Sequence, residues 1–433
     1  MVARRCAPVG WTAGRGAVPP SPAPRSIPSS KGPIPLSAFP VDAATALAGP
    51  AWLQGRRADA ASSFAAASLP DAQEEVWRYS RIAELDLDRY APSVDAVSVT
   101  LDLPEEWASK GVTVLHAADL VDDTSGIGSV AQGGPDVFAT LNDAFTVDPV
   151  VVSVPRGVQL EAPLVIGTHL AGAGTAGFPR LVVLVGEGAA ATVVDRTTST
   201  DDDLLSVPLT ELHVERGGRL DFVAIQQLGS NAWQLGSLVT EVGQEAHLRV
   251  GLVGLGGAYA RLRTDCRLTG RGGTGDLLAA YFGDGDQTLD FRTFQHHDAP
   301  DTTSNLLFKG AVGGRSRSVY TGLIKVSKDA RGTNAFQTNR NVKLSDEAWA
   351  ESVPNLEIET NDVRCSHAST VGPVDPEQRF YLESRGVPPT TADRLIVAGF
   401  FDEVVRDLPD EALVDEVRQQ ISEKLDRVAG DLR

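Results

Sequence analysis

The chain has 433 residues, of which 42% are hydrophobic, and its formal net charge at pH 7 is −18. This length and apolar content predict a soluble globular protein with a sizeable core, and they exclude disorder throughout the chain. The negative charge disfavours nucleic acid and anionic membranes as partners, and no apolar run reaches the ~18 residues of a membrane span. Three scattered cysteines are too few for a disulfide framework, which favours a reducing compartment such as the cytoplasm.

The first 41 residues differ in composition from the rest of the chain. They contain nine prolines and several arginines, and the first acidic residue is Asp42. Such a segment cannot pack a core, and an Arg- and Ser-containing stretch without acids also resembles an organellar transit peptide. We therefore predict a disordered or targeting tail over residues 1–45. A transit peptide would make a plastid the alternative to a cytoplasmic location.

Residues 46–149 are predicted to form a helical or mixed N-terminal domain. The pattern from Pro50 to about Tyr90 is helical, with acids before an aromatic cluster in LPDAQEEVWRYS. Two runs further on, VSVTLDL and GVTVLHA, alternate between apolar and polar residues as strands do.

Residues 150–380 are predicted to form a long β-rich core. Short apolar runs and glycine turns alternate here, as in VGEGAAATVV from Val185, VERGGRLDFV from Val214 and VGQEAHLRVG from Val242. These segments recur after about 26 to 29 residues, within the range of roughly 20 to 50 residues that marks repeat architectures. A repeat of strands and tight turns without helices predicts a β-solenoid, with a β-sandwich as the alternative.

Residues 381–433 are predicted to form a helical C-terminal domain. Thr390 and Thr391 are expected to cap a first helix, and Asp410 with Glu411 to open a second one. The second helix has one apolar stripe formed by Leu413, Val417, Ile421, Leu425 and Val428. Such a stripe packs either on the helix's own domain or on a partner.

Cys365 and His367 are the strongest candidates for chemistry. Residues two apart in a strand point to the same face, so thiol and imidazole would lie side by side. Both groups are ligands that zinc, iron and iron-sulfur clusters accept, but two ligands cannot complete a tetrahedral site. The alternative interpretation is a buried, inert cysteine beside a solvated histidine.

Other candidate motifs carry less weight. His296, His297 and Asp298 precede a turn-forming stretch, and adjacent histidines on a strand point to opposite faces, so we interpret them as solvated loop residues. Cys266 is expected to be a strand residue. The G-x-G-x-x-G at Gly270–Gly275 has no βαβ unit around it and predicts a turn.

No catalytic residue can be assigned, because no P-loop motif and no catalytic triad are recognisable. The chain is therefore not expected to be an ATPase. A β-solenoid with scattered acids is also compatible with a polysaccharide lyase or hydrolase that works with paired carboxylates. Against that enzyme class, aromatic residues make up only 6% of the chain.

One stretch, Thr302 to Val387, resembles the SufB/SufD family of iron-sulfur cluster assembly proteins. The segments SNLLFKG, QTNR from Gln337, PNLEI, CSHAST and FYLESRG match that family in order, and EEVWRYS at residues 74–80 resembles its N-terminal part. In SufB members a cysteine follows the glutamine, whereas Thr338 stands there in this chain. Together with Cys365, Ser366 and His367, this is the pattern of SufD members.

The resemblance implies a mainly β fold, with a right-handed parallel β-helix core flanked by N-terminal and C-terminal helical domains. It implies a SufB partner docked core to core, and a SufC ATPase bound through the C-terminal helical domain. The chain would be an assembly scaffold of the SUF system rather than an enzyme. Cys365 and His367 would contribute to a transient iron-sulfur cluster at the SufB interface, with none bound by this chain alone. A purely structural subunit, with SufB carrying the chemistry, is the alternative within the family.

Overall fold

The computed structural model describes residues 39–120, 126–131 and 134–428. Residues 1–38 of the predicted disordered or targeting tail therefore lie outside the described residues. Of the predicted tail, only residues 39–45 are described, and they belong to the fold: Phe39 is buried and helix α1 spans Val41–Thr45.

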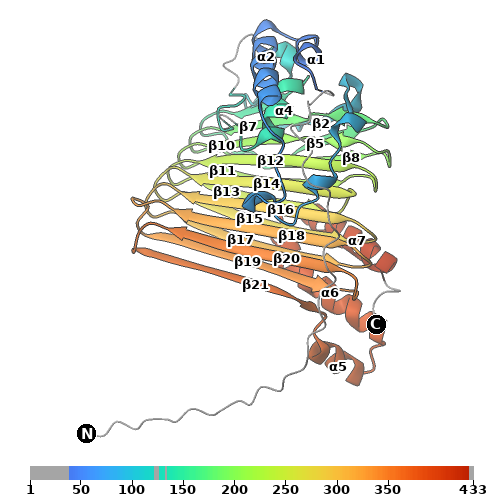
Figure 1. The fold of residues 1–433 in the computed structure, drawn as a ribbon. Helices are drawn as coiled ribbons and strands as arrows, with labels where there is room; N and C mark the ends of the chain where they lie inside the picture. Colours follow the sequence, from blue (N-terminus) through green and yellow to red (C-terminus); the bar gives the residue numbers. More distant parts are fainter. Residues whose placement is uncertain (1–38, 121–125, 132–133, 429–433) are drawn as a thin grey trace, which may run out of the picture. The chain divides into compact units, whose positions relative to one another are not determined.

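Two long sheets dominate the described chain (Figure 1). The first sheet has its main strands in the order β20-β18-β16-β14-β12-β10-β7-β4-β3, and the second has the order β2-β5-β8-β11-β13-β15-β17-β19-β21. The first comprises β3 (Thr113–Leu115), β4 (Val150–Val154), β7 (Arg180–Val185), β10 (Leu209–Val214), β12 (Trp233–Val242), β14 (Tyr259–Leu268), β16 (Thr288–His297), β18 (Arg317–Val326) and β20 (Trp349–Ile358), with the short strands β1 (Ala91–Pro92), β6 (Thr175–Gly177) and β9 (Leu205–Ser206) beside it. The second comprises β2 (Val97–Asp102), β5 (Leu164–Leu170), β8 (Ala190–Ser199), β11 (Arg219–Gln227), β13 (His247–Gly254), β15 (Thr274–Gly283), β17 (Thr303–Val312), β19 (Thr333–Lys343) and β21 (Val363–Pro373).

The chain alternates between the two sheets, so each coil adds one strand to both of them. Leu209 of β10 pairs in parallel with Ser237 of β12, 28 residues later in the sequence. The turn from β7 to β8 is made by residues 186–189, where Gly188 has a φ of +64° that favours glycine. The predicted parallel β-solenoid is thereby confirmed, and the sandwich alternative is wrong because sandwiches are built from antiparallel strands.

Two apolar layers hold the coils together. Inward-facing side chains such as Val183, Val193 and Leu212 pack between the sheets. On the outer face of the second sheet, Val223 and Phe282 belong to a cluster with residues of α6 (Pro389–Val405) and α7 (Glu411–Val428). All five residues of the predicted apolar stripe on α7 are buried in this cluster, namely Leu413, Val417, Ile421, Leu425 and Val428. The stripe therefore packs on the helix's own chain.

The N-terminal region is less helical than predicted. Helix α2 spans Ala51–Ala66, and α4 spans Val137–Phe145. Between the end of α2 and Tyr90, where further helix was predicted, the chain forms only short 3₁₀ turns. These are η1 (Glu75–Trp77), η2 (Ile82–Glu84) and η3 (Leu87–Arg89), followed by η4 (Val94–Ala96), α3 (Glu105–Ser109) and η5 (Ala117–Asp119). Tertiary contacts decide this conformation: Arg261 stacks 3.6 Å above the Trp77 ring, and Arg292 donates a hydrogen bond to the Arg78 carbonyl.

The C-terminal helices begin differently from the prediction at one point. Helix α5 spans Pro376–Ser384, and α6 begins at Pro389 with Pro388 as its N-cap. The capping role predicted for Thr390 and Thr391 is therefore wrong, because Pro388 and Pro389 start the helix and both threonines lie within its first turn. The second start is as predicted, since Asp410 accepts a hydrogen bond of 3.0 Å from the Leu413 amide.

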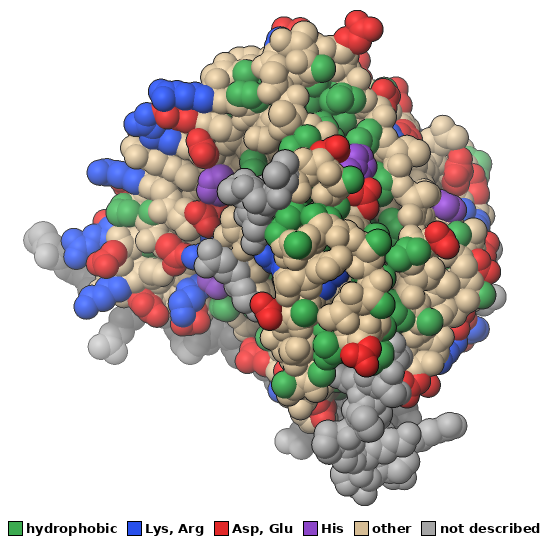
Figure 2. Space-filling view, turned by 90° about the horizontal axis from the view of Figure 1, so that it is seen from above, with side chains coloured by type: hydrophobic (Ala, Val, Ile, Leu, Met, Phe, Trp, Pro, Cys, Tyr) green, Lys and Arg blue, Asp and Glu red, His purple; other side chains and the backbone are tan. Residues whose placement is uncertain are grey.

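Charged side chains of both signs are interspersed on the face seen in Figure 2. Apolar side chains are scattered between them on that face rather than gathered into one large patch. Within the described ranges, no helix is both long and apolar enough to cross a membrane.

Candidate functional site

Cys365 and His367 lie on β21, the last strand of the second sheet. Cys365 pairs in register with Ala335 of β19, and His367 pairs with Gln337. Both partners are buried and face the interior between the sheets. In register, Cys365 and His367 therefore share one face of β21, with their Cα atoms roughly 7 Å apart along the strand.

The last coil leaves this face partly open. His367 is exposed and Cys365 is partly buried, whereas the paired positions one coil earlier are covered. Thr338 lies on the opposite face of β19, between the exposed Phe336 and Arg340. The Thr338 side chain is thus directed away from Cys365 and His367.

The Cys365 thiol has an apolar neighbourhood. It packs against a small cluster that includes Ile324, Val326 and Ala335. Burial raises the pKa of the thiol, and a backbone hydrogen bond with Ala335 opposes that rise. A thiolate is the form that binds metal, so Cys365 becomes a ligand only when a cation displaces its proton.

A polar network lies beneath the last coil. The Tyr281 hydroxyl is 2.8 Å from Oδ1 of Asn341 and accepts a hydrogen bond of 2.9 Å from Asn339. Asn341 in turn donates to Asn339 over 2.8 Å. Gly310 makes room for this arrangement, since a Cβ atom there would lie 2.0 Å from the Tyr281 ring. The inward face of β19 is therefore held rigidly from below.

Gln337 is the polar side chain that is paired with His367. It is 1% exposed, and neither its amide nitrogen nor its amide oxygen has a hydrogen-bond partner among the described residues. Buried polar groups are normally hydrogen-bonded, so such a group requires an explanation. An amide next to a histidine can orient the imidazole ring, which is a common role for the partner of a metal ligand.

The pair of side chains offers one soft and one borderline ligand on an exposed edge. In the described part of the chain, no three His, Cys, Asp or Glu side chains gather closely enough to hold a metal ion. Cys365 and His367 thus form a two-ligand fragment that fits iron or an iron-sulfur cluster by its donor types.

The other sequence candidates have different settings. His296 and His297 end β16 and face opposite sides, as predicted, but the interpretation of both as solvated loop residues is wrong. His297 is fully buried, with Nδ1 2.7 Å from the Thr302 hydroxyl and Nε2 2.9 Å from the Ser304 hydroxyl. Cys266 is a buried residue of β14, and Gly270–Gly275 leads from β14 into β15 through a tight turn, both as predicted.

The two final strands present free edges. β20 pairs with β18, and β21 pairs with β19, and no further described strand pairs with either of them. The edge strands are ten and eleven residues long. Ile358 on β20 and Val371 on β21 are each 40% exposed. Long unprotected edges are uncommon in monomeric proteins, because they pair readily with other strands.

A second surface was not predicted from the sequence. A groove of about 840 Å³ lies between the outer face of the last coils and helices α5 and α6. Lys309 lines it and donates a hydrogen bond of 2.9 Å to the Phe400 carbonyl. Tyr381 and Leu395 line the groove and are 58% and 53% exposed, and Phe380, the residue before Tyr381, is 71% exposed. In the sequence, the segment FYLESRG carries only a family resemblance, which gives no indication that its aromatic residues are exposed.

Comparison with known proteins adds the following relationships. The family model described as SUF system FeS cluster assembly, SufBD core domain, matches residues 168–400. An iron-sulfur cluster assembly SufBD family protein of Mycobacterium tuberculosis is 34% identical over 366 residues, which cover 82% of this chain and 88% of that protein. A relative from Mycobacterium leprae is 32% identical over 365 residues, with the same coverage. The iron-sulfur cluster assembly protein SufD of Escherichia coli is 29% identical over 82% of this chain and 89% of its own length.

Proposed function

Since the chain belongs to the SufBD family of iron-sulfur cluster assembly proteins, we propose that it is a SufD-like scaffold subunit of the SUF complex. It pairs with a SufB-like paralogue, binds a SufC-like ATPase through its C-terminal helices, and takes part in building clusters between the paired subunits. The similarity to the SufD protein of Escherichia coli supports the choice of paralogue. Thr338 and the Cys365-Ser366-His367 run support it as well, because they match the SufD pattern.

The observation that carries this proposal is the position of Cys365 and His367 on an unpaired sheet edge. A solenoid partner with edges of its own can continue both sheets across β20 and β21 by backbone hydrogen bonds. Such pairing would cover the exposed Ile358 and Val371. It would also bring the partner's side chains beside Cys365 and His367, which supply only two of the ligands that a cluster site needs.

The cluster is cargo of this complex and leaves it for acceptor proteins. A site that must release its cargo benefits from a thiol that is only partly buried and from ligands divided between two chains. The raised pKa of Cys365 favours the protonated thiol once the metal has gone.

The exposed aromatic residues of α5 are the proposed contact for the ATPase. Tyr381 and Leu395 line the groove together with Lys309 and Glu403, and the exposed Phe380 is next to Tyr381 on α5. Aromatic anchors dominate the affinity of protein interfaces. Helices α6 and α7 connect this surface to the second sheet through their shared apolar cluster. ATP-driven pairing of two ATPase subunits would thereby shift the scaffold interface and expose the cluster site.

Co-purification of the full chain with a SufB-like and a SufC-like subunit tests the proposed contacts. Val371→Arg places a charge beside the β21 edge and is expected to abolish SufB-like binding while SufC-like binding persists. Leu103→Arg is the matched control, because Leu103 is similarly exposed but lies after β2, at the opposite end of the second sheet. Unchanged SufB-like binding by Val371→Arg would contradict docking at this edge.

The groove contact is tested by Phe380→Ala combined with Tyr381→Ala. Both side chains are exposed, so the substitutions are expected to leave the fold intact. SufC-like binding should fall by at least about tenfold, as expected for the loss of two aromatic anchors, and SufB-like binding should not change. Unaltered ATPase binding would remove α5 from the proposed interface.

A further inference from the structure

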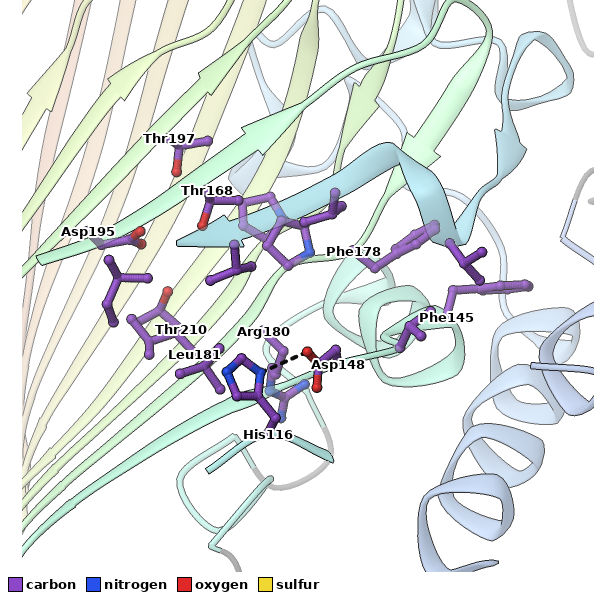
Figure 3. Close-up of a pocket in the computed structure, with 18 of the residues that line it drawn as sticks. His116, Phe145, Asp148, Thr168, Phe178, Arg180, Leu181, Asp195, Thr197 and Thr210 are labelled. Atoms are coloured by element: carbon purple, nitrogen blue, oxygen red, sulfur yellow. Dashed lines mark hydrogen bonds and ion pairs between the residues drawn. The ribbon is translucent and has the colours of Figure 1, made fainter. Parts of the chain in front are cut away.

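A cavity lies between the two sheets near the N-terminal end of the solenoid (Figure 3). Its first lobe has a volume of about 160 Å³, with walls that include inward-facing residues of β5, β8, β7 and β10. A second lobe of about 60 Å³ extends along the interior as far as Phe291. The two lobes share Asp195, Thr197, Pro208 and Thr210 in their walls, so they are adjacent along the interior. The cavity is distant in the sheet order from β20 and β21 and is independent of the proposed cluster site.

The first lobe approaches the surface at one end. Val94 is 50% exposed there, and His116 is half-buried and lies 2.8 Å from Asp148. Arg180 also borders this lobe, but its guanidinium is bound to Glu211 and Asp143. A small molecule therefore has a route from solvent to the interior that passes polar side chains.

Polar side chains without partners line this space. Asp195, Thr168, Thr197 and Thr210 line the first lobe, and Gln234 lines the second. None of the five has a side-chain hydrogen bond or an ion pair with another described residue. Gln234 and Thr168 are each 6% exposed. Since buried polar groups in folded proteins nearly always have a partner, this row indicates a place that is built to bind something.

Asp195 is the most unusual member of the row. Asp195 is partly buried, whereas the fully buried carboxylates Glu211 and Asp290 are paired with Arg180 and Arg292. Asp195 has no cation beside it, and burial alone raises its pKa to about 7. A carboxylate without a counter-ion in the interior of a protein is unfavourable. A cationic ligand would remove that cost on binding.

The rest of the wall defines the body of the ligand. Ile166 and Leu181 face the first lobe, and Phe222, Leu238 and Leu252 face the second. An ammonium group has three donors, and the Asp195 carboxylate and the hydroxyls of Thr197 and Thr210 in the same wall can accept hydrogen bonds from them. A cavity of about 150 Å³ in another protein holds benzene, so this first lobe has room for about six non-hydrogen atoms.

We propose that this cavity is a binding site for a small primary alkylammonium ion, with its nitrogen at Asp195 and its aliphatic chain along the apolar walls. The negative charge of the Asp195 carboxylate favours a cation over an anion. The apolar walls favour a cation with an alkyl chain over a bare metal ion. The site thus assigns this chain a small-molecule ligand in addition to its protein partners.

Calorimetric titration of the full chain with n-pentylammonium tests the proposal. We expect one molecule to bind per chain with a Kd below about 1 mM, since a ligand of six atoms reaches that range with moderate efficiency. Pentan-1-ol and pentanoate should bind at least tenfold more weakly. Sodium and potassium ions at the same concentration should not compete.

Two variants make the result specific to Asp195. Asp195→Asn removes the unpaired charge, so it should fold at least as well as the parent chain while its affinity for n-pentylammonium falls at least tenfold. Asp221→Asn is the control, because Asp221 is on the adjacent strand β11 but faces outward near Arg249. Equal binding of pentan-1-ol, equal affinity of Asp195→Asn, or displacement by sodium or potassium would each overturn the proposal.

Discussion

His367 of β21 and Gln337 of β19 occupy paired positions on the same face of the second sheet. Neighbouring strands are about 4.8 Å apart, so the buried amide lies directly next to the exposed imidazole. The amide has no hydrogen-bond partner among the described residues. In the proposed function, Gln337 orients His367 when the cluster is assembled, and is a positioning residue rather than a ligand.

Gln337→Leu tests this role, because leucine keeps most of the volume and removes the amide. Loss of an unsatisfied buried amide should leave the free energy of unfolding unchanged or raise it by up to about 1 kcal/mol. Cluster yield in the reconstituted complex should nevertheless fall, since removal of a partner of a metal-binding histidine typically costs about tenfold or more. Denaturant unfolding and cluster yield, measured on the same preparation, separate the two effects. A stable variant with full yield would contradict the positioning role.

Lys424 anchors α7 to the solenoid. Its ammonium group donates to the Phe282 carbonyl over 2.6 Å, and to Asp284 and Gln287 over 2.7 Å each. Lys424→Met should lower the free energy of unfolding by about 3 kcal/mol, because it leaves buried acceptors unpaired. Lys424 is only 3% exposed, and this burial lowers the pKa of its ammonium group to about 8.

Arg427→Met is the matched control for this anchor. Arg427 binds the same carboxylate, Asp284, but is 55% exposed. Its loss should cost less than about 1 kcal/mol, as for other exposed ion pairs. Equal losses in the two variants, measured by denaturant unfolding, would show that the burial of Lys424 contributes nothing.

His297 makes the fold sensitive to acid. Burial lowers its pKa from 6.5 to about 4, so the folded protein binds this proton less readily than the unfolded chain. The free energy of unfolding therefore falls as the pH drops through the window from about 6.5 to about 4. Through His297 alone, the free energy of unfolding should be about 2 kcal/mol lower at pH 5 than at pH 7.

A comparison of His297→Gln with His296→Gln checks this assignment. His297→Gln should be less stable at pH 7, but it should lose about 2 kcal/mol less than the parent chain between pH 7 and pH 5. His296 lies on the opposite face and is 28% exposed, so its replacement should change the acid dependence much less. Identical acid dependence in His297→Gln and the parent would contradict the prediction.

The repeat of the solenoid could be predicted from the sequence because its signal is local. Each coil needs glycine turns at fixed intervals and inward-facing apolar residues, and both are visible in segments such as the one from Val185. The 3₁₀ turns around Trp77 could not be predicted, since contacts with Arg261 on a distant strand determine them. The burial of His297 was missed because Ser304, which contacts one of its nitrogens, lies beyond the turn on β17, a strand of the opposite sheet.

The candidate site was predictable in part. The alternation of side chains along a strand predicts from the sequence alone that Cys365 and His367 share one face of β21. The unpaired edge and the neighbouring Gln337 depend on strand order, which single-strand patterns do not contain. Asp195 could have been found by counting alternation from Val193, which places an acid at an inward position between Val193 and Thr197.

The contribution of Cys365 and His367 to cluster assembly is the central claim. The most direct test is anaerobic reconstitution of the complex with the SufB-like and SufC-like subunits, followed by measurement of bound iron and sulfide per complex. The Cys365→Ala, His367→Ala double variant should bind both subunits normally and lose at least about tenfold in cluster yield. Ser366→Ala, between the two ligands on the other face of β21, should keep the parental yield. A full yield of iron and sulfide in the double variant would contradict the account and leave the chain a purely structural subunit.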